Sequence, residues 1–404
     1  MNIVIIGGGA AGFFAAITAS EADPAARVTI LERGNAVLQK VRVSGGGRCN
    51  VTHACFDARV LVQHYPRGSR ELLGPFLRFG PADTVEWFAR RGVRLKTEAD
   101  GRMFPDTNDS QTIVECLWNA AKAAGVQVRM GTRVERLEKT AAGWVVHLGK
   151  IPPERADCVL VAGGSSEALW ALLANLGHTI VPPVPSLFTF NCKDVRLREL
   201  AGVSVPKAVV RVVGTKLSAE GPLLVTHWGL SGPAVLRLSA WGARQLHEIG
   251  YQFSLSVKWV GDLPITAIEA GLSQLKQEQG RRQIGSHAQF GLPQRLWERL
   301  VEAAEMPVEM RWGDLTKPVL ARLAAQIGNA KFDVRGKSTF KEEFVTAGGV
   351  DLREINFKTF ESKHLSGLYL AGEVLDIDAI TGGFNFQAAW TGAWIAGHAM
   401  VEPA

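Results

Sequence analysis

Residues 2–32 constrain the fold of this chain more than any other stretch. The β-branched run from Ile3 to Ile6 predicts a buried parallel strand, and glycines in the spacing GxGxxG follow it. The apolar stretch 13–20 predicts a helix, and residues 27–31 predict a second strand that ends at Glu32, 20 residues after the last of these glycines. Strand, glycines, helix and acidic residue in this order are typical of a unit that binds an adenine dinucleotide.

Each part of this pattern has a physical role in dinucleotide binding. Gly7 makes the tight turn, Gly9 has no Cβ to keep a pyrophosphate away from the backbone, and Gly12 lets helix and strand approach closely. The free N–H groups at the helix N-terminus carry roughly half a positive charge, which favours the pyrophosphate. The Glu32 carboxylate can accept hydrogen bonds from both ribose hydroxyls, and its charge would repel a 2′-phosphate.

The composition is typical of a large folded protein in a reducing compartment. A chain of 404 residues with 47% hydrophobic residues can bury the cores of two or three domains. No stretch reaches the roughly 18–20 consecutive apolar residues of a membrane span, and the chain enters its first strand at residue 2 without a secretory leader. The five scattered cysteines show neither a CxxC pair nor metal-ligand spacing. We therefore expect a cytoplasmic protein with no membrane partner and no metal site.

The positive charge is concentrated in one segment. The chain has 45 basic and 39 acidic residues, and residues 40–102 alone contain 12 basic and 6 acidic ones. This segment directly follows the dinucleotide pattern, where it could meet a pyrophosphate or an anionic substrate. The alternative is that Arg90, Arg91, Arg94 and Lys96 form an ordinary solvated helix end.

Residues 39–52, QKVRVSGGGRCNVT, form a second glycine-rich stretch. Three consecutive glycines make its backbone thin and free to take positive φ, and the polar side chains around them favour a ligand-binding loop over a core segment. At this point the sequence resembles a known family. GGGAAG, SGGGRCNVT and the later GEVLDID and TGGFNFQ are similar to segments of the BaiN/YhiN (BaiN/RdsA) group of bacterial flavoproteins. The resemblance covers essentially the whole chain.

The resemblance implies a Rossmann-like (GR2-type) FAD-binding domain, with FAD bound tightly and NAD(P)H as a transient reductant. The glycine loop would lie against FAD near its isoalloxazine ring, so that Arg48 and Cys49 would be near the reactive edge. The alternative for Cys49 is a buried inert thiol. The expected cofactor-binding residues are Gly7, Gly9, Ala11, Gly12, Glu32, Arg33, Lys40, Ser44, Gly45, Gly46, Gly47, Arg48, Val134, Gly163, Gly164, Gly372, Glu373, Asp376, Gly383, Asn385, Phe386 and Gln387.

The C-terminal part supplies a second expected anchor for the flavin. Glu373 follows a predicted strand over residues 367–372, where related flavoproteins place an acidic residue on the FAD ribityl chain. A helix over residues 387–400 would direct its N-terminal amides at flavin N1 and O2. This anchor favours FAD over NAD, because a free NAD site needs no matching element 370 residues away. The chain departs from the family at Ala379, usually Gly, and at Phe384, usually Tyr.

The expected fold class is α/β, with an insert that interrupts the FAD-binding domain. This domain is expected to comprise residues 1–185 and 345–404. The glycine turn at residues 163–164 is the point where the chain of such an FAD-binding domain usually returns to the nucleotide site. Short apolar runs between glycine and proline turns predict an antiparallel β subdomain over 186–262. Residues 263–344 are expected to form a mainly helical subdomain. We expect the insert to carry the substrate site.

Residues 226–233, THWGLSGP, are an unusual stretch within the insert, and the family has a similar THxGxSGP segment. His227 titrates near neutrality when unperturbed, so it could serve as a proton donor, and Trp228 could stack on a planar ring. The alternative is a strand-to-helix turn with residues 231–233 as its cap and His227 as a structural histidine. The sequence leaves both open.

Together these features predict an FAD-dependent oxidoreductase in which NAD(P)H reduces the flavin and a hydride passes to an electron-poor C=C bond. The adjacent carbon needs a proton from Cys49 or His227, and a thiol with an ordinary pKa near 8.5 is protonated at pH 7. Cys49 is slightly favoured, because its glycine loop would be tied to the flavin, and Cys49→Ala is then expected to cost more turnover than His227→Ala. The resemblance implies two kinds of substrate, an enone-like steroid or bile-acid compound and a uridine in ribosomal RNA. A third hypothesis is a non-catalytic RNA-binding protein that FAD stabilises.

Overall fold

The computed structural model describes residues 1–149, 151–338 and 345–402. The chain divides into two compact units, Met1–Val184 with Lys341–Ala404, and Pro185–Phe340. Within the described ranges, no helix is both long enough and apolar enough to cross a membrane.

The first unit is built on a seven-stranded sheet with the order β20-β21-β22-β10-β1-β2-β6. Strands β22, β10, β1, β2 and β6 pair in parallel, and β20 and β21 add an antiparallel edge. The strands of this unit are β1 (Asn2–Ile6), β2 (Arg27–Leu31), β3 (Thr52–His53), β4 (Leu95–Thr97), β5 (Arg102–Pro105), β6 (Gln127–Arg129), β7 (Arg136–Thr140), β8 (Gly143–Leu148), β9 (Ile151–Ala156), β10 (Cys158–Val161), β19 (Val345–Val350), β20 (Ile355–Asn356), β21 (Glu361–Ser362) and β22 (Leu368–Leu370), and β11 (Ile180–Ser186) leads out of it.

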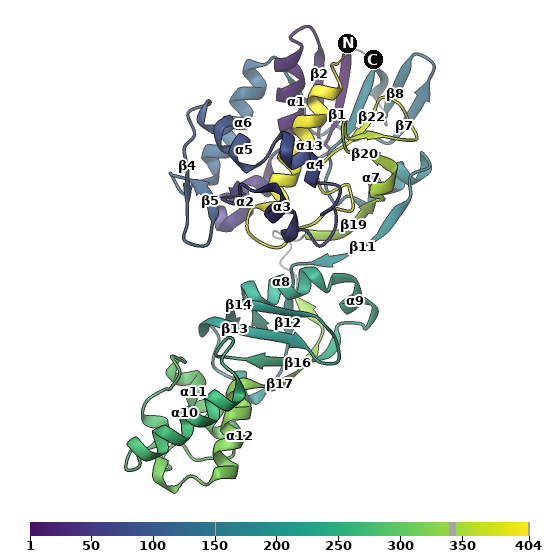
Figure 1. Ribbon diagram of the computed structural model, residues 1–404. Helices are drawn as coiled ribbons and strands as arrows, with labels where there is room; N and C mark the ends of the chain where they lie inside the picture. The colour runs from purple at the N-terminus through teal and green to yellow at the C-terminus, as the bar shows by residue number, and fades with distance from the viewer. Residues whose placement is uncertain (150, 339–344, 403–404) are drawn as a thin grey trace. The chain divides into compact units, whose positions relative to one another are not determined.

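Two helices of small residues lie side by side in this unit, α1 and α13 (Figure 1). A Cβ on Gly397 would come within 2.9 Å of the Ala15 carbonyl oxygen, so the absence of a side chain lets the two backbones approach closely. The helices of the unit are α1 (Ala10–Ala22), α2 (Gln39–Gly47), α3 (Ala58–Leu61), α4 (Leu73–Arg78), α5 (Pro81–Ala89), α6 (Ser110–Ala123), α7 (Glu167–Asn175) and α13 (Phe384–Ala399), with 3₁₀ turns η1 (Val62–His64) and η5 (Leu352–Glu354).

The second unit combines an antiparallel sheet with helices around one apolar core. The sheet has the order β17-β16-β13-β14-β15-β12-β18, and Figure 1 shows α10, α11 and α12 gathered beside β16 and β17. Its strands are β12 (Thr189–Asn191), β13 (Ser204–Val212), β14 (Ser218–Val225), β15 (Gly229–Ser231), β16 (Gln252–Lys258), β17 (Ala330–Arg335) and β18 (Lys337–Ser338). Its helices are α8 (Pro233–Trp241), α9 (Ala243–Glu248), α10 (Ile265–Glu278), α11 (Gln294–Ala303) and α12 (Lys317–Gly328), with 3₁₀ turns η2 (Val195–Leu197), η3 (Ile284–Ser286) and η4 (Trp312–Asp314).

The predicted α/β class, with a parallel nucleotide-binding sheet interrupted by a mixed insert, is confirmed. The elements differ from expectation in several places. Helix α13 begins at Phe384 instead of residue 387, and α2 occupies the first part of the stretch expected to be a loop. Helices α8 and α9 lie within the stretch expected to be β, where Pro233 occupies the first turn of α8. Strand β17 lies within the stretch expected to be mainly helical and pairs with β16, because its alternating pattern buries Phe332 and Val334 on the core face. The expected end of that stretch, residue 344, lies outside the described residues.

Candidate functional site

The three glycines after β1 differ in what surrounds them. Gly7 has φ +112°, and a Cβ there would lie 2.6 Å from the Cα of Gly163. On Gly12 a Cβ would lie 2.0 Å from the Gly7 carbonyl oxygen. Gly9, just before α1, has no atom within 4 Å of the position of its missing Cβ. The first and third glycines are therefore required by packing, whereas the second leaves open space at a helix N-terminus, which is where a pyrophosphate would bind.

Glu32 lies at the end of β2 and is half-buried. Its two carboxylate oxygens accept hydrogen bonds from the backbone N–H of Gly8, at 2.8 Å, and of Gly34, at 2.7 Å. These bonds orient the carboxylate and leave one lone pair on each oxygen for a ribose hydroxyl. Arg33 beside it is exposed, and Val134 is buried.

The glycine loop continues from α2. Ser44, Gly45 and Gly46 leave helical geometry, and Gly45, Gly46 and Gly47 all have positive φ. At Gly46 and Gly47 a Cβ would meet no atom within 4 Å, whereas at Gly45 it would lie 3.0 Å from the Phe104 ring. Two of the three glycines therefore present bare backbone to open space, as a loop that lies against a ligand requires.

Distant parts of the chain meet at this loop. Lys40 forms an ion pair with Glu373, 333 residues later in the chain. A Cβ on Gly164 would lie 3.6 Å from the same carboxylate, and a Cβ on Gly372 would lie 3.2 Å from that of Ala11. The structure therefore brings together residues from four of the segments that the sequence assigned to cofactor binding.

Two side chains near the start of α13, those of Gln387 and Asn385, have partners within the protein. The side chain of Gln387 is fully buried and accepts hydrogen bonds from Thr52, at 2.6 Å, and Thr84, at 3.0 Å. Asn385 exchanges two hydrogen bonds with the backbone of Ala379. The side chains of Gln387 and Asn385 thus fix the packing of the helix, and cofactor contact by Gln387 stays a prediction that would rest on its backbone.

Three further residues expected to bind the cofactor, Phe386, Asp376 and Gly383, contact other parts of the protein. Phe386 stacks on Trp390 with the ring centroids 5.5 Å apart. Asp376 is buried, and its N–H donates to the Val350 carbonyl oxygen. Gly383 has φ +88°, and a Cβ there would lie 2.5 Å from the Thr52 carbonyl oxygen. This glycine lets the N-terminus of α13 pack directly against β3.

Arg48 and Cys49 differ in accessibility although they are adjacent. The Arg48 guanidinium is partly exposed, donates to Glu98 at 2.6 Å and lies 4.0 Å from the centre of the Phe104 ring. The Cys49 side chain is fully buried at φ +58°. Burial raises the pKa of the Cys49 thiol to about 12, although a hydrogen bond with Ser44 acts in the opposite direction. The expected ordinary pKa of Cys49 is therefore wrong, and the buried thiol is a weak acid.

His53 was not expected at this site. Its ring stacks on Phe384 with the centroids 4.6 Å apart, and its Nε2–H donates to the Asp100 carbonyl oxygen at 3.1 Å. Nδ1 is buried and has no hydrogen-bond partner among the described residues. Burial lowers the pKa of His53, against the opposing effect of its bond to Asp100, which leaves Nδ1 as an unprotonated acceptor. The only signal in the sequence was its place directly after the NVT of the glycine loop.

His227 belongs to the second unit. It lies with Trp228 in the exposed turn between β14 and β15, where the Gly229 N–H donates back to the Thr226 carbonyl oxygen. The Trp228 side chain is 59% exposed, so it is available to stack on a ligand. The turn itself follows the expected strand-to-helix path, since β15 leads into α8.

The residues of the first unit fit a bound FAD. Gly9, Gly46 and Gly47 leave open space beside bare backbone. Glu32 is oriented for a ribose, and Lys40 and Glu373 lie at the loop that would face the flavin. Each of these features is one that a dinucleotide would complete.

Comparison with known proteins gives a consistent result. The family model described as the HI0933-like protein Rossmann domain matches residues 1–399. A 3-dehydro-bile acid delta(4,6)-reductase from Clostridium scindens is 30% identical over 412 residues, which cover 99% of this chain and 99% of that protein. A ribosomal RNA dihydrouridine synthase from Escherichia coli is 28% identical over 410 residues, which cover 99% of this chain and 98% of that protein.

Among solved structures, a 3-ketosteroid-delta4-(5alpha)-dehydrogenase from Rhodococcus jostii shares the fold. The TM-score is 0.53 at 17% sequence identity, and the match covers 99% of this chain and 96% of that one. The family and sequence matches confirm the predicted BaiN/YhiN group of flavoproteins and the predicted oxidoreductase class. This chain belongs to the HI0933-like family.

Proposed function

We propose that this protein is an FAD-dependent oxidoreductase that takes electrons from NAD(P)H and reduces an electron-poor C=C bond. Bound FAD would supply the hydride-transfer chemistry. The observation that supports this most directly is the open space beside Gly9, Gly46 and Gly47, on two segments that packing holds in place. The named activities of the relatives, reduction of a bile-acid derivative and formation of dihydrouridine, both saturate a C=C bond next to a carbonyl group.

Arg48 is the residue best suited to hold the charge that develops on the substrate. Its guanidinium is fixed by Glu98 and by the face of Phe104, yet about a third of the side chain stays exposed. A fixed, partly exposed cation stabilises the enolate oxygen that forms when a hydride adds to a conjugated C=C bond. We therefore assign Arg48 to substrate orientation and charge stabilisation.

Of the two expected proton donors, Cys49 is the weaker candidate. Cys49 is buried, and a thiol with a pKa of about 12 is a poor donor at neutral pH. His227 is exposed in the unit expected to carry the substrate site. Replacing Cys49 with Ala should therefore lower turnover less than replacing His227 with Ala, for which we expect a loss of about 10²–10⁴-fold. An equal loss of turnover in both variants would contradict the preference for His227 as the proton donor.

A small enone is the favoured substrate class. The basic excess of residues 40–102 could meet an anionic substrate such as RNA, but in the structure acidic residues outside this segment pair with part of it: Lys40–Glu373, Arg67–Asp378, Arg91–Glu21 and Arg94–Asp106. Uridine in ribosomal RNA is the second candidate, because relatives named for that activity are 28% and 30% identical.

Two assays separate these candidates. Purified protein with NAD(P)H should reduce a 4-ene-3-oxo steroid under anaerobic conditions, with Arg48→Ala strongly impaired although its FAD content is unchanged. Sequencing-based mapping of dihydrouridine in ribosomal RNA from a deletion strain tests the second candidate, since loss of one modified position would establish it. If no donor reduces the flavin and Arg48→Ala retains cellular function, a non-catalytic FAD-stabilised scaffold remains as the explanation.

A further inference from the structure

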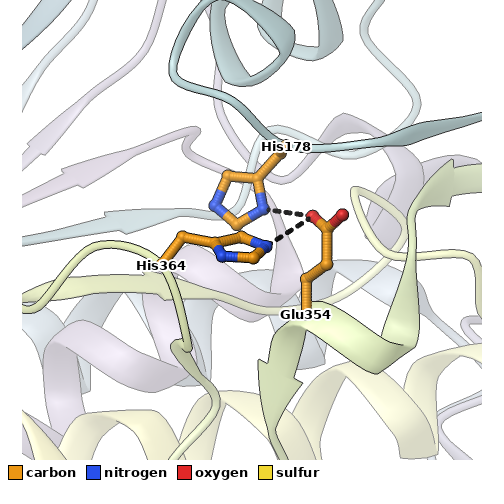
Figure 2. Close-up of side chains that lie close together, drawn as sticks. All are labelled: His178, Glu354 and His364. Carbon is orange, nitrogen blue, oxygen red and sulfur yellow. Dashed lines mark hydrogen bonds and ion pairs between the residues drawn. The ribbon is translucent and has the colours of Figure 1, made fainter.

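Three side chains from separate segments converge at the antiparallel edge of the first sheet (Figure 2). His178 follows α7, Glu354 ends η5, and His364 follows β21. His178 Nδ1 lies 2.7 Å from Glu354 Oε2, and His364 Nε2 lies 3.6 Å from the same oxygen. One nitrogen from each imidazole and one carboxylate oxygen therefore lie within 4.8 Å of one another.

This donor set matches the chemistry of a borderline-soft divalent cation. Two imidazoles and one carboxylate are a common set of zinc ligands, with metal–ligand distances of about 2.0–2.2 Å. Tetrahedral bonds of that length separate neighbouring ligand atoms by about 3.3 Å. The observed separations of 2.7 and 3.6 Å lie on either side of this value, so small side-chain rotations would admit the ion.

The surrounding groups hold these ligands in place. His178 Nε2 lies 3.1 Å from Ser362 Oγ, which also accepts the N–H groups of His364 and Leu365. The Thr179 N–H donates to both oxygens of Glu354. Outer hydrogen bonds of this kind fix the ring orientation of metal ligands.

Charge and access also suit a cation. Glu354 places a carboxylate oxygen beside one nitrogen of each imidazole, and this oxygen can share a cation with both rings. The side chain of His178 is fully buried, whereas that of His364 is 48% exposed. An ion can therefore enter from the solvent beside His364 and complete its coordination with water.

We propose that His178, Glu354 and His364 form a binding site for a zinc-class divalent cation. On binding, the hydrogen that His178 Nδ1 shares with Glu354 moves to Nε2, beside Ser362 Oγ, so that the neutral ring coordinates the ion through Nδ1. The ion links η5, the turn after β21 and the turn after α7. Its expected role is structural, because these segments lie at the edge of the sheet formed by β20 and β21. The glycines expected to hold the cofactor, Gly7, Gly9 and Gly12, which we call the glycine cradle, follow β1 instead. The site is independent of the proposed oxidoreductase activity.

The test uses the full-length FAD-loaded protein after treatment with EDTA. Zn²⁺ alone is titrated against a chromophoric chelator, and we expect one tightly bound ion per chain. His364→Gln is the main variant, because a half-exposed side chain can be replaced without disturbing the core, and it should weaken Zn²⁺ affinity more than about tenfold. His287→Gln, an exposed histidine of the second unit, is the matched control and should bind as the wild type does.

A second readout is the melting temperature. Zn²⁺ should raise it in a concentration-dependent way in the wild type and in His287→Gln, but not in His364→Gln, while FAD content stays equal in all three. Absence of a stoichiometric ion in the wild type would overturn the proposal. Unchanged Zn²⁺ affinity in His364→Gln would overturn it as well.

Discussion

At the scale of single residues, the burial of Cys49 has a measurable chemical consequence. A raised pKa leaves less thiolate at a given pH than an ordinary cysteine has, and only the thiolate is alkylated. Burial and the nearby Asp57 raise the pKa of Cys55 too, but its side chain is only half-buried. In the native protein at pH 8, iodoacetamide should therefore modify Cys55 slowly and leave Cys49 unmodified, whereas both should react after denaturation. Mass spectrometry of the digested protein measures this. Modification of Cys49 as fast as Cys55 would show that the thiol is accessible.

The ion pair of Arg67 with Asp378 joins two segments 311 residues apart, and the Asp378 side chain is fully buried. Removing one partner of a buried pair leaves the other charge in a poor environment, so Asp378→Ala should lower the free energy of unfolding by about 3–5 kcal/mol. Glu86→Ala removes an exposed pair with Arg90 and should cost less than about 1 kcal/mol. Urea denaturation compares the two variants, and equal losses would contradict the prediction.

At the scale of elements, two glycines at the start of α1 give opposite predictions. Gly9→Val should fold but retain no FAD, because the new side chain fills the open space at the helix N-terminus. Gly12→Val should fail to fold stably, since its Cβ would lie 2.0 Å from the Gly7 carbonyl oxygen. Circular dichroism and flavin absorbance of the two purified variants provide the measurement. If Gly9→Val bound FAD at the wild-type level, the pyrophosphate would not bind beside Gly9.

The elements also show how far sequence reasoning reaches. Strands β1 and β2 and helix α10 follow from local patterns, and so do the glycines of the cradle, because their roles depend on neighbours in the chain. The pairing of β17 with β16 and the meeting of Lys40 with Glu373 depend on contacts across long separations. The same reason explains why the side-chain partners of Gln387 could not be predicted. Its partners, Thr52 and Thr84, lie more than 300 residues away in the sequence.

At the scale of the whole molecule, the salt dependence of substrate binding separates the two candidate substrates. If the substrate is a neutral enone, its affinity should change little between 50 and 200 mM salt, because no phosphate contacts release counterions. An RNA held by 6–10 phosphate contacts would lose about 10³–10⁵-fold in affinity over that range. Binding measured at four salt concentrations distinguishes the two, and a steep decline would favour the ribosomal RNA substrate.

If this protein is an FAD-dependent reductase of an electron-poor C=C bond, its flavin should be reducible by a nicotinamide and reoxidisable by the substrate. The most direct test is the anaerobic absorbance spectrum of the purified protein, first with NADH or NADPH and then with the 4-ene-3-oxo steroid. We predict one FAD per chain, bleaching of its visible bands by one of the two nicotinamides, and return of the bands when the steroid is added. A protein that purifies without FAD, or whose reduced flavin is reoxidised neither by the steroid nor by unmodified ribosomal RNA, would contradict the account.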